Sequence, residues 1–270
     1  MNVTSKDGTT IAYDAHGDGP ALILVDGALT TRTSEFRPPL IQLLQPHFTV
    51  VGYDRRGRGD SGDTQPYSVE REIDDIDALI ARFDGRACLH GQSSGGCLAL
   101  EATRVLGTGK VAGVSAYEAP WNDDPAAQRA WQKYRRDLAA ALADGRRGDA
   151  VALFVQYVGT SPQEVAAMRE MPFWASLEAL APTLAYDAEV IGPTGAVPTR
   201  RLGDVTAPAL ALCGSASPRF MCDSASTVGR AVRAGRSRTL EGQVHAVQPK
   251  AIAPVLIEFF GGLGAATRVA

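Results

Sequence analysis

Hydrophobic residues in this chain form short runs that are separated by segments of helical periodicity. Apolar runs of strand length occupy residues 21–25, 48–53, 86–90, 110–117 and 209–213. Helical patterns occupy residues 35–44, 69–82, 97–106, 224–233 and 250–260. A strand is apolar throughout when helices cover both of its faces. Strands and helices that alternate in this order predict an α/β domain with a parallel sheet and right-handed crossovers.

The two ends of the chain extend this pattern. Residues 2–5 and 10–16 flank the turn Lys6-Asp7-Gly8, which predicts an opening β-hairpin. A further strand is expected near residues 237–241, which makes eight strands, most of them parallel. Residues 261–270 follow the last predicted helix and are expected to fray.

The alternation stops between residues 121 and 201. This stretch has helical patterns only, and prolines interrupt it at positions 125, 162, 172, 182, 193 and 198. Residues 126–143 form a long amphipathic pattern, and Ser161-Pro162-Gln163-Glu164 has the sequence of a capping box with proline at the first helical position. We therefore expect a helical cap over residues 121–201, inserted into a core domain of residues 1–120 and 202–270.

The segment Gly91-Gln92-Ser93-Ser94-Gly95 stands between a predicted strand and a predicted helix. A turn this sharp brings the residues on either side of the serine so close that only glycine fits there. The pattern predicts a nucleophile elbow with Ser93 exposed at its corner. The amino terminus of the following helix would stabilise negative charge that develops beside Ser93.

A serine nucleophile needs a base, and the chain has four histidines. His16 and His47 lie in the first fifth of the chain, and strand alternation directs His90 away from Ser93. His245 follows the last predicted strand and is our candidate base. The oxyanion needs two backbone N–H donors, for which we expect Ser94, and Ala28 in the loop after residues 21–25.

Residues 53–62 are similar to the Asp-x-Arg-Gly-x-Gly-x-Ser segment of α/β hydrolases. With the elbow, the helical insertion and the late histidine, the whole chain resembles the α/β-hydrolase fold superfamily. The resemblance implies a capped, cofactor-independent serine hydrolase, although the same fold also hosts dehalogenases, epoxide hydrolases and lyases. Residues 57–62 also fit Gly-x-Gly-x-x-Gly, but no helix opens inside them and two arginines crowd them, so we expect no dinucleotide there.

The chain departs from the family pattern at the acid of the triad. The usual aspartate position, after residues 209–213, is occupied by Ser217, and the first carboxylate there is Asp223. Some family members place the acid after the preceding strand, where this chain has Glu118 at the carboxyl edge of the sheet. We favour Glu118 as the partner of His245 and keep Asp223 as the alternative.

A second departure is Asp26, which stands where the family usually has histidine before the oxyanion glycine. Two interpretations are open. The Asp26 side chain caps its loop by bonding the backbone, or it tunes protonation of the substrate or a leaving group. Among the aromatic residues of the cap, Trp121 and Phe173 are the ones that we expect to contact substrate.

Composition and charge limit the class of partner. The chain is 45% hydrophobic and 21% charged, and it has 27 basic against 30 acidic residues. A net charge of −3 gives no basis for binding nucleic acid, so the expected partner is a small-molecule substrate. The amino terminus lacks the apolar core of a signal peptide, and no apolar run is as long as the roughly 18 residues of a membrane span. We therefore expect a cytoplasmic protein without membrane association.

The four cysteines, at positions 88, 97, 213 and 222, match no metal-site spacing. We expect them to be free thiols buried in the core, as suits a reducing compartment. Neither a metal nor a cofactor is expected. The sequence leaves the oligomeric state open, a homodimer included.

Three classes of function are consistent with these residues. The leading hypothesis is a serine hydrolase of a small-molecule ester or lactone that acts through a Ser-His-acid triad and an acyl-enzyme. The alternative is a lyase, cyclase or isomerase that uses the same pocket with His245 as acid and base; Asp26 and the unusual acid position keep it open. A binding protein without activity is disfavoured, because both Ser93 and His245 are present.

Overall fold

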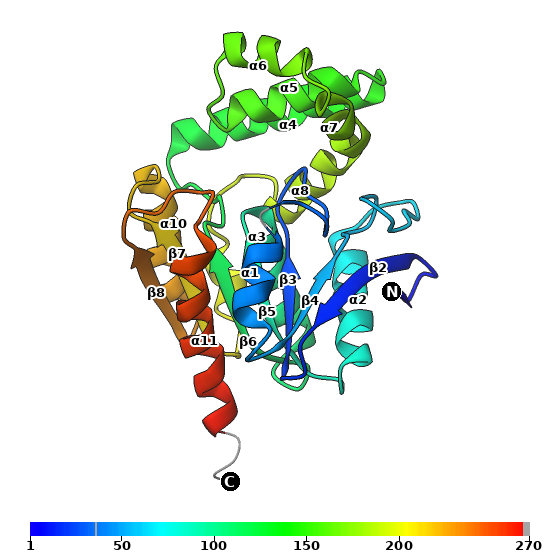
Figure 1. The fold of residues 1–270 in the computed structure, drawn as a ribbon. Coiled ribbons are helices and arrows are strands. Elements are labelled where there is room, and N and C mark those ends of the chain that lie inside the picture. The colour runs from blue at the N-terminus through cyan, green and yellow to red at the C-terminus, as the bar shows by residue number, and fades with distance from the viewer. Residues whose placement is uncertain (36, 267–270) are drawn as a thin grey trace.

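Eight strands form one sheet in the computed structural model, which describes residues 1–35 and 37–266 (Figure 1). Their order is β1-β2-β4-β3-β5-β6-β7-β8. The strands are β1 (Asn2–Thr4), β2 (Thr10–His16), β3 (Ala21–Val25), β4 (Thr49–Tyr53), β5 (Ala87–Gln92), β6 (Val111–Tyr117), β7 (Ala209–Gly214) and β8 (Gly235–Leu240). The first two strands pair antiparallel, and all pairs from β4 to β8 are parallel. This arrangement confirms the predicted fold class, the opening hairpin and the eight strands.

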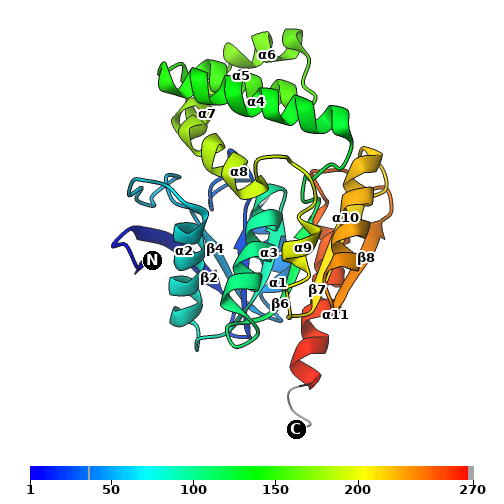
Figure 2. The same cartoon turned by 180° about the vertical axis from the view of Figure 1, so that it is seen from behind.

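Helices cover both faces of the sheet. One face carries α1 (Arg37–Leu44) and α11 (Pro249–Ala266), and the other carries α2 (Val69–Arg82), α3 (Ser94–Leu106), α9 (Thr199–Leu202) and α10 (Arg219–Ala231) (Figure 2). Strand β3 shows why its sequence is apolar throughout. Leu22 and Leu24 pack into the core on the α1 and α11 side, whereas Ile23 and Val25 pack into the core on the α2 and α3 side. Each side chain of β3 is therefore buried by one of the two helical layers.

The last helix is longer than the sequence predicts. The expectation of a frayed tail is wrong for residues 261–266, which continue α11, while residues 267–270 lie outside the described part of the chain. The glycines of this stretch are poor helix formers. Leu263 compensates by packing into the core beneath the sheet, where Gly113 in β6 leaves room for its side chain. Tertiary packing thus overrides the local propensity.

A layer of helices lies above the carboxyl ends of the parallel strands (Figure 1). It comprises α4 (Pro125–Ala143), α5 (Arg147–Tyr157), α6 (Pro162–Arg169), α7 (Trp174–Leu180), the short 3-10 helix Ala181–Thr183 and α8 (Leu184–Ile191). The predicted capping box is present, with Ser161 and Glu164 bonding each other's backbone. We call this layer the cap. The division of the chain at residues 121 and 201 into two domains stays a prediction. No helix of the described residues is long and apolar enough to cross a membrane.

Two of the cysteines form a disulfide, so the expectation of four free thiols is wrong for this pair. Cys213 in β7 is joined to Cys222 in α10, while Cys88 and Cys97 are free and buried. The two bonded residues are only nine positions apart, without a recognisable motif. The turn from β7 into α10 brings their Cα atoms to 5.2 Å, which the sequence could not indicate. The bond also removes the support that free thiols gave to a reducing compartment.

Reduction of this disulfide is expected to lower the free energy of unfolding. Closing a loop of nine residues removes entropy from the unfolded chain, which amounts to roughly 2–3 kcal/mol. Urea unfolding with and without a reductant measures the difference. The variant Cys213→Ala/Cys222→Ala is the control, since its unfolding midpoint should not respond to the reductant. An equal response in both proteins contradicts the prediction.

Candidate active site

Ser93 lies at the corner between β5 and α3, as the elbow motif predicts. Its backbone has φ 57° and ψ −130°, a left-handed conformation that is unusual for a residue with a side chain. The neighbouring backbone requires glycine on both sides. A Cβ atom on Gly91 would lie 2.2 Å from the carbonyl oxygen of Gly95, and one on Gly95 would lie 2.1 Å from the carbonyl oxygen of Val25. The strained corner is therefore held by close backbone packing, which projects Ser93 into the cavity below the cap.

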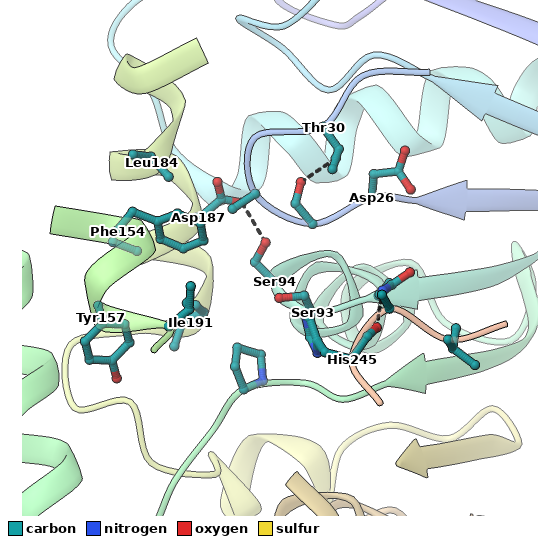
Figure 3. Close-up of a pocket in the computed structure, with 18 of the residues that line it drawn as sticks. Asp26, Thr30, Ser93, Ser94, Phe154, Tyr157, Leu184, Asp187, Ile191 and His245 are labelled. Atoms are coloured by element: carbon teal, nitrogen blue, oxygen red, sulfur yellow. Dashed lines mark hydrogen bonds between the residues drawn. The ribbon is translucent and has the colours of Figure 1, made fainter. Parts of the chain in front are cut away.

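His245 follows β8 on a loop that is anchored to the elbow. The Gln92 side chain donates a hydrogen bond to the His245 carbonyl (2.8 Å), and the Tyr117 hydroxyl donates to the Val244 carbonyl (2.6 Å). Ser93 and His245 line the same cavity (Figure 3). The Nδ1 atom of His245 lies 2.7 Å from the Oε2 atom of Glu118. This contact leaves the Nε2 atom to exchange a proton with a hydroxyl.

Glu118 follows β6 and is fully buried. Its Oε1 atom accepts a hydrogen bond from the backbone N–H of Gly214 (2.8 Å), at the end of β7. Burial by itself raises the pKa of Glu118, but the contact with His245, the nearby Ser217 hydroxyl and the hydrogen bond from Gly214 outweigh burial and hold the pKa below its usual value. The carboxylate is therefore charged at neutral pH and faces His245.

Asp223, the alternative acid, does not approach His245 in the structure. It lies on α10 with a side chain that is 67% exposed, and its partner is Arg219 at 3.6 Å. Of the two carboxylates that the sequence offered, the structure brings only Glu118 to the histidine.

The two expected oxyanion donors both border Ser93. Ser94 begins α3, and the loop of residues 26–28, which follows β3, lines the same cavity. This loop approaches so closely that a Cβ atom on Gly27 would lie 2.9 Å from the Cβ atom of Ser93. The carbonyl oxygen of Gly27 accepts hydrogen bonds from Thr30 (2.7 Å) and Arg58. Ala28, Ser93 and Ser94 all line the cavity. Figure 3 labels Ser93 and Ser94 there.

The cavity above Ser93 has a volume of about 890 Å³. Large apolar side chains of the cap form part of its wall: Trp131, Tyr134, Phe154, Tyr157, Leu184 and Ile191. The sequence analysis missed this set, because helical periodicity does not tell which apolar face of a cap turns to a ligand and which to the cap's own core. Several of these residues do both, since Trp131, Tyr134 and Leu184 also belong to the core of the cap.

Trp121 and Phe173, which we expected to contact substrate, are not among the lining residues. Trp121 is 2% exposed in the main core, where its indole N–H donates to the Ile191 carbonyl (2.9 Å). Phe173 precedes α7 and is 45% exposed to solvent. Of these two aromatic residues, one is buried in the core and the other lies on the surface. Residue type alone does not tell such positions from those of the cavity wall.

Asp26 borders the cavity, but its carboxylate is paired with the buried guanidinium of Arg37 in α1. The interpretation that Asp26 caps its own backbone is therefore wrong, because its side chain is paired with a cation instead. Burial lowers the pKa of Arg37 to about 10, which still leaves it charged at neutral pH. A carboxylate neutralised in this way has little capacity to shift the protonation of a substrate.

Neither His90 nor any of the four cysteines is among the residues that line the cavity. His90 is buried on the other side of β5 and contacts the Ser115 hydroxyl at 2.7 Å, and burial lowers its pKa to about 3. Its absence from the cavity wall agrees with the direction that strand alternation predicts. Across residues 1–35 and 37–266, no group of three or more His, Cys, Asp or Glu side chains is arranged to hold a metal ion.

Comparison with known proteins places this geometry in a family. The model of the Alpha/beta hydrolase family matches residues 15–255. An α/β hydrolase from Sphaerobacter thermophilus is 43% identical, with a TM-score of 0.84 over 96% of this chain and 100% of its own. The enol-lactonase of Burkholderia xenovorans is 20% identical, with a TM-score of 0.65 over 97% of this chain and 100% of its own, which shows a shared fold.

Among curated relatives, a proline iminopeptidase of Pestalotiopsis fici is 34% identical over 100 residues. The match covers 34% of this chain and 35% of the relative, so the chain spans about a third of that protein's length. The family model, by contrast, covers most of the present chain and includes Ser93, Glu118 and His245. The chain therefore belongs to the alpha/beta hydrolase family, and the relatives named above are hydrolytic enzymes.

Proposed function

We propose that this enzyme is a cofactor-independent serine hydrolase that cleaves a small-molecule ester or lactone. The observation that carries the proposal is the contact of 2.7 Å between Glu118 and His245, in a cavity that Ser93 also lines. Nucleophile, base and orienting acid are the three parts that acyl transfer to serine requires. Each lies at the carboxyl edge of the sheet, on the loop that follows β5, β8 or β6.

In the proposed mechanism, the Oγ atom of Ser93 attacks the carbonyl carbon and passes its proton to Nε2 of His245. Glu118 accepts a hydrogen bond from the Nδ1 proton of His245, fixes its tautomer and stabilises the charged ring. The negative oxygen of the tetrahedral intermediate accepts hydrogen bonds from the backbone N–H groups of Ala28 and Ser94. His245 then protonates the leaving alcohol. A water molecule, activated by His245, hydrolyses the acyl-enzyme and restores Ser93.

The cavity supports a substrate with a sizeable apolar part. Its volume of about 890 Å³ and the aromatic and aliphatic cap residues around it suit a hydrophobic acyl or alcohol group. Because an enol-lactonase shares the fold, a lactone remains in the proposal beside an open-chain ester. A cytoplasmic location and the oligomeric state, a homodimer included, stay predictions.

The non-hydrolytic alternative depended on Asp26 and on the unusual position of the acid, Glu118. Asp26 is neutralised by Arg37, which leaves it little capacity for acid and base chemistry on a substrate. The contact of Glu118 with His245 would serve His245 as acid and base in either class of reaction. With Asp26 paired, no specific observation favours lyase, cyclase or isomerase chemistry, and we propose hydrolysis alone.

A fluorophosphonate probe tests whether Ser93 is activated. We expect one covalent adduct per wild-type chain by intact-mass spectrometry, and none in Ser93→Ala or His245→Ala, because the probe reacts with a serine whose proton a base removes. Ser176→Ala, at an exposed serine of α7, is the matched control and should be labelled like the wild type. Failure of the folded wild-type protein to react, or labelling that persists in Ser93→Ala, contradicts the proposal.

Replacement of Glu118 tests the acid of the triad. In Glu118→Gln the His245 tautomer is no longer fixed, and we expect kcat for an ester to fall by about 10³- to 10⁴-fold. Asp223→Asn should stay within about twofold of the wild type, because Asp223 is exposed and does not line the cavity. Steady-state kinetics on p-nitrophenyl esters shows which of the two carboxylates is the acid of the triad. Equal, small effects of the two substitutions would exclude both carboxylates as the orienting acid.

The lowered pKa of Glu118 predicts a pH-dependent contribution to stability. Its unfolded-state pKa is close to 4.5, and its folded-state pKa is lower, so ionised Glu118 stabilises the fold above pH 4.5. This contribution is lost as the pH falls through the folded-state pKa. We expect the unfolding free energies of wild type and Glu118→Gln to differ most at pH 7 and to converge at acidic pH. Urea unfolding at a series of pH values measures this; a difference that does not change with pH contradicts it.

A further inference from the structure

A buried cluster of charges connects the cap to the catalytic corner. Asp187 on α8 is almost fully enclosed, and its carboxylate contacts three groups of the core: Arg55, Arg58 and Ser94. Both arginines belong to the loop after β4, and Arg58 lies within the Gly-x-Gly-x-x-Gly segment of residues 57–62. Asp187 and Ser94 also line the cavity with Ser93, so this cluster reaches the cavity wall (Figure 3).

The first connection of Asp187 is to Ser94, the residue after the nucleophile. The Ser94 hydroxyl donates a hydrogen bond of 2.7 Å to the Oδ1 atom of Asp187. Burial raises the pKa of Asp187, but Arg58, Arg55 and Ser94 outweigh burial and hold it below its usual value, so the acceptor is charged. A hydrogen bond to a charged acceptor is short and strong. It fixes the first residue of α3, whose backbone N–H is the first oxyanion donor.

The second connection runs through Arg58 to the other oxyanion donor. The Nη2 atom of Arg58 lies 2.9 and 2.8 Å from the two carboxylate oxygens of Asp187, and its Nη1 atom donates to the Gly27 carbonyl. That carbonyl and the Ala28 N–H belong to one planar trans peptide, in which they point in opposite directions. Because Arg58 binds the Gly27 carbonyl oxygen on one side of this peptide, it directs the Ala28 N–H toward the opposite side. It also polarises the peptide, which makes the N–H a better donor.

Arg55 supports the same arrangement through the preceding peptide, between Asp26 and Gly27. Its Nη1 atom contacts Asp187 at 2.7 Å and the Asp26 carbonyl at 3.2 Å, and its remaining donors bind Glu72 at 2.7 and 2.6 Å. Two arginines and two carboxylates balance in charge while all four are buried. Removing any one partner would leave an uncompensated buried charge, which is strongly destabilising.

We propose that Asp187 is a positioning residue that aligns both N–H donors of the oxyanion hole, which makes the cap a part of the catalytic apparatus. The inference rests on the proposed function. An anchor that only fastened α8 to α3 would need no contact with the peptide of the second donor. The observed network reaches both donors from one carboxylate, through the Ser94 hydroxyl on one side and Arg58 on the other.

Asp187→Asn tests this inference with two substrates, p-nitrophenyl acetate and its thiono analogue, in which sulfur replaces the carbonyl oxygen. Oxyanion-hole donors stabilise developing charge on oxygen, so their misalignment affects the oxygen ester more than the thiono ester. We expect kcat for the oxygen ester to fall about 10- to 100-fold with KM nearly unchanged, and the oxygen-to-thiono ratio of kcat/KM to fall about tenfold. Glu189→Gln, an exposed carboxylate on the same helix, is the matched control and should keep the wild-type ratio.

The outcomes separate this inference from the proposed function. If the wild type hydrolyses neither ester, the proposed function is overturned and the inference with it. If the wild type is active and Asp187→Asn slows both esters equally, Asp187 has a structural role only and the inference fails. If Asp187→Asn does not fold, Ser94→Ala decides, because it removes one hydroxyl and leaves the charges paired. A reduced oxygen-to-thiono ratio in Ser94→Ala supports the inference, and a wild-type ratio overturns it.

Discussion

Close backbone packing at the turn from β5 to α3 is the constraint on which the site depends. Gly95 approaches the end of β3 so closely that any side chain there would overlap the Val25 carbonyl. This contact brings the loop of residues 26–28 against Ser93 and starts α3 at Ser94. Ser93 and the two proposed oxyanion donors are thus placed by one backbone contact between the first turn of α3 and the end of β3, before any side chain contributes.

Buried charged side chains then fix the geometry of the site in more detail. Glu118 is held by the Gly214 N–H while it faces His245, and Asp26 is neutralised by Arg37. Each carboxylate has a partner that fixes its direction as well as its charge. Desolvation makes such groups costly to bury alone, so the pairs act as geometric restraints more than as sources of net stability.

The sequence predicted the elements that follow from periodicity and turn chemistry. The apolar run of β3, the capping box at Ser161 and the elbow at Ser93 each have a local signal, and each is present. The disulfide and the pairing of Asp26 with Arg37 have none, since they depend on how distant segments pack. The prediction of the cavity wall failed for the same reason. Trp121 and Tyr157 are both aromatic and both come after β6 in the chain. Only the packing of α4 and α5 decides that Tyr157 borders the cavity and Trp121 does not.

The same packing limits how the cap can move. Lifting α8 away from α3 would separate the Asp187 carboxylate from two buried guanidinium groups, and breaking a buried pair costs about 3–5 kcal/mol. Separation of α8 from α3 is therefore a rare way for the cap to open. The cavity instead reaches the surface beside Leu43, Tyr157 and Val158, which line it and are exposed. This opening would let a substrate enter past α1 and the end of α5 while α8 stays in place, so that the proposed oxyanion donors keep their alignment.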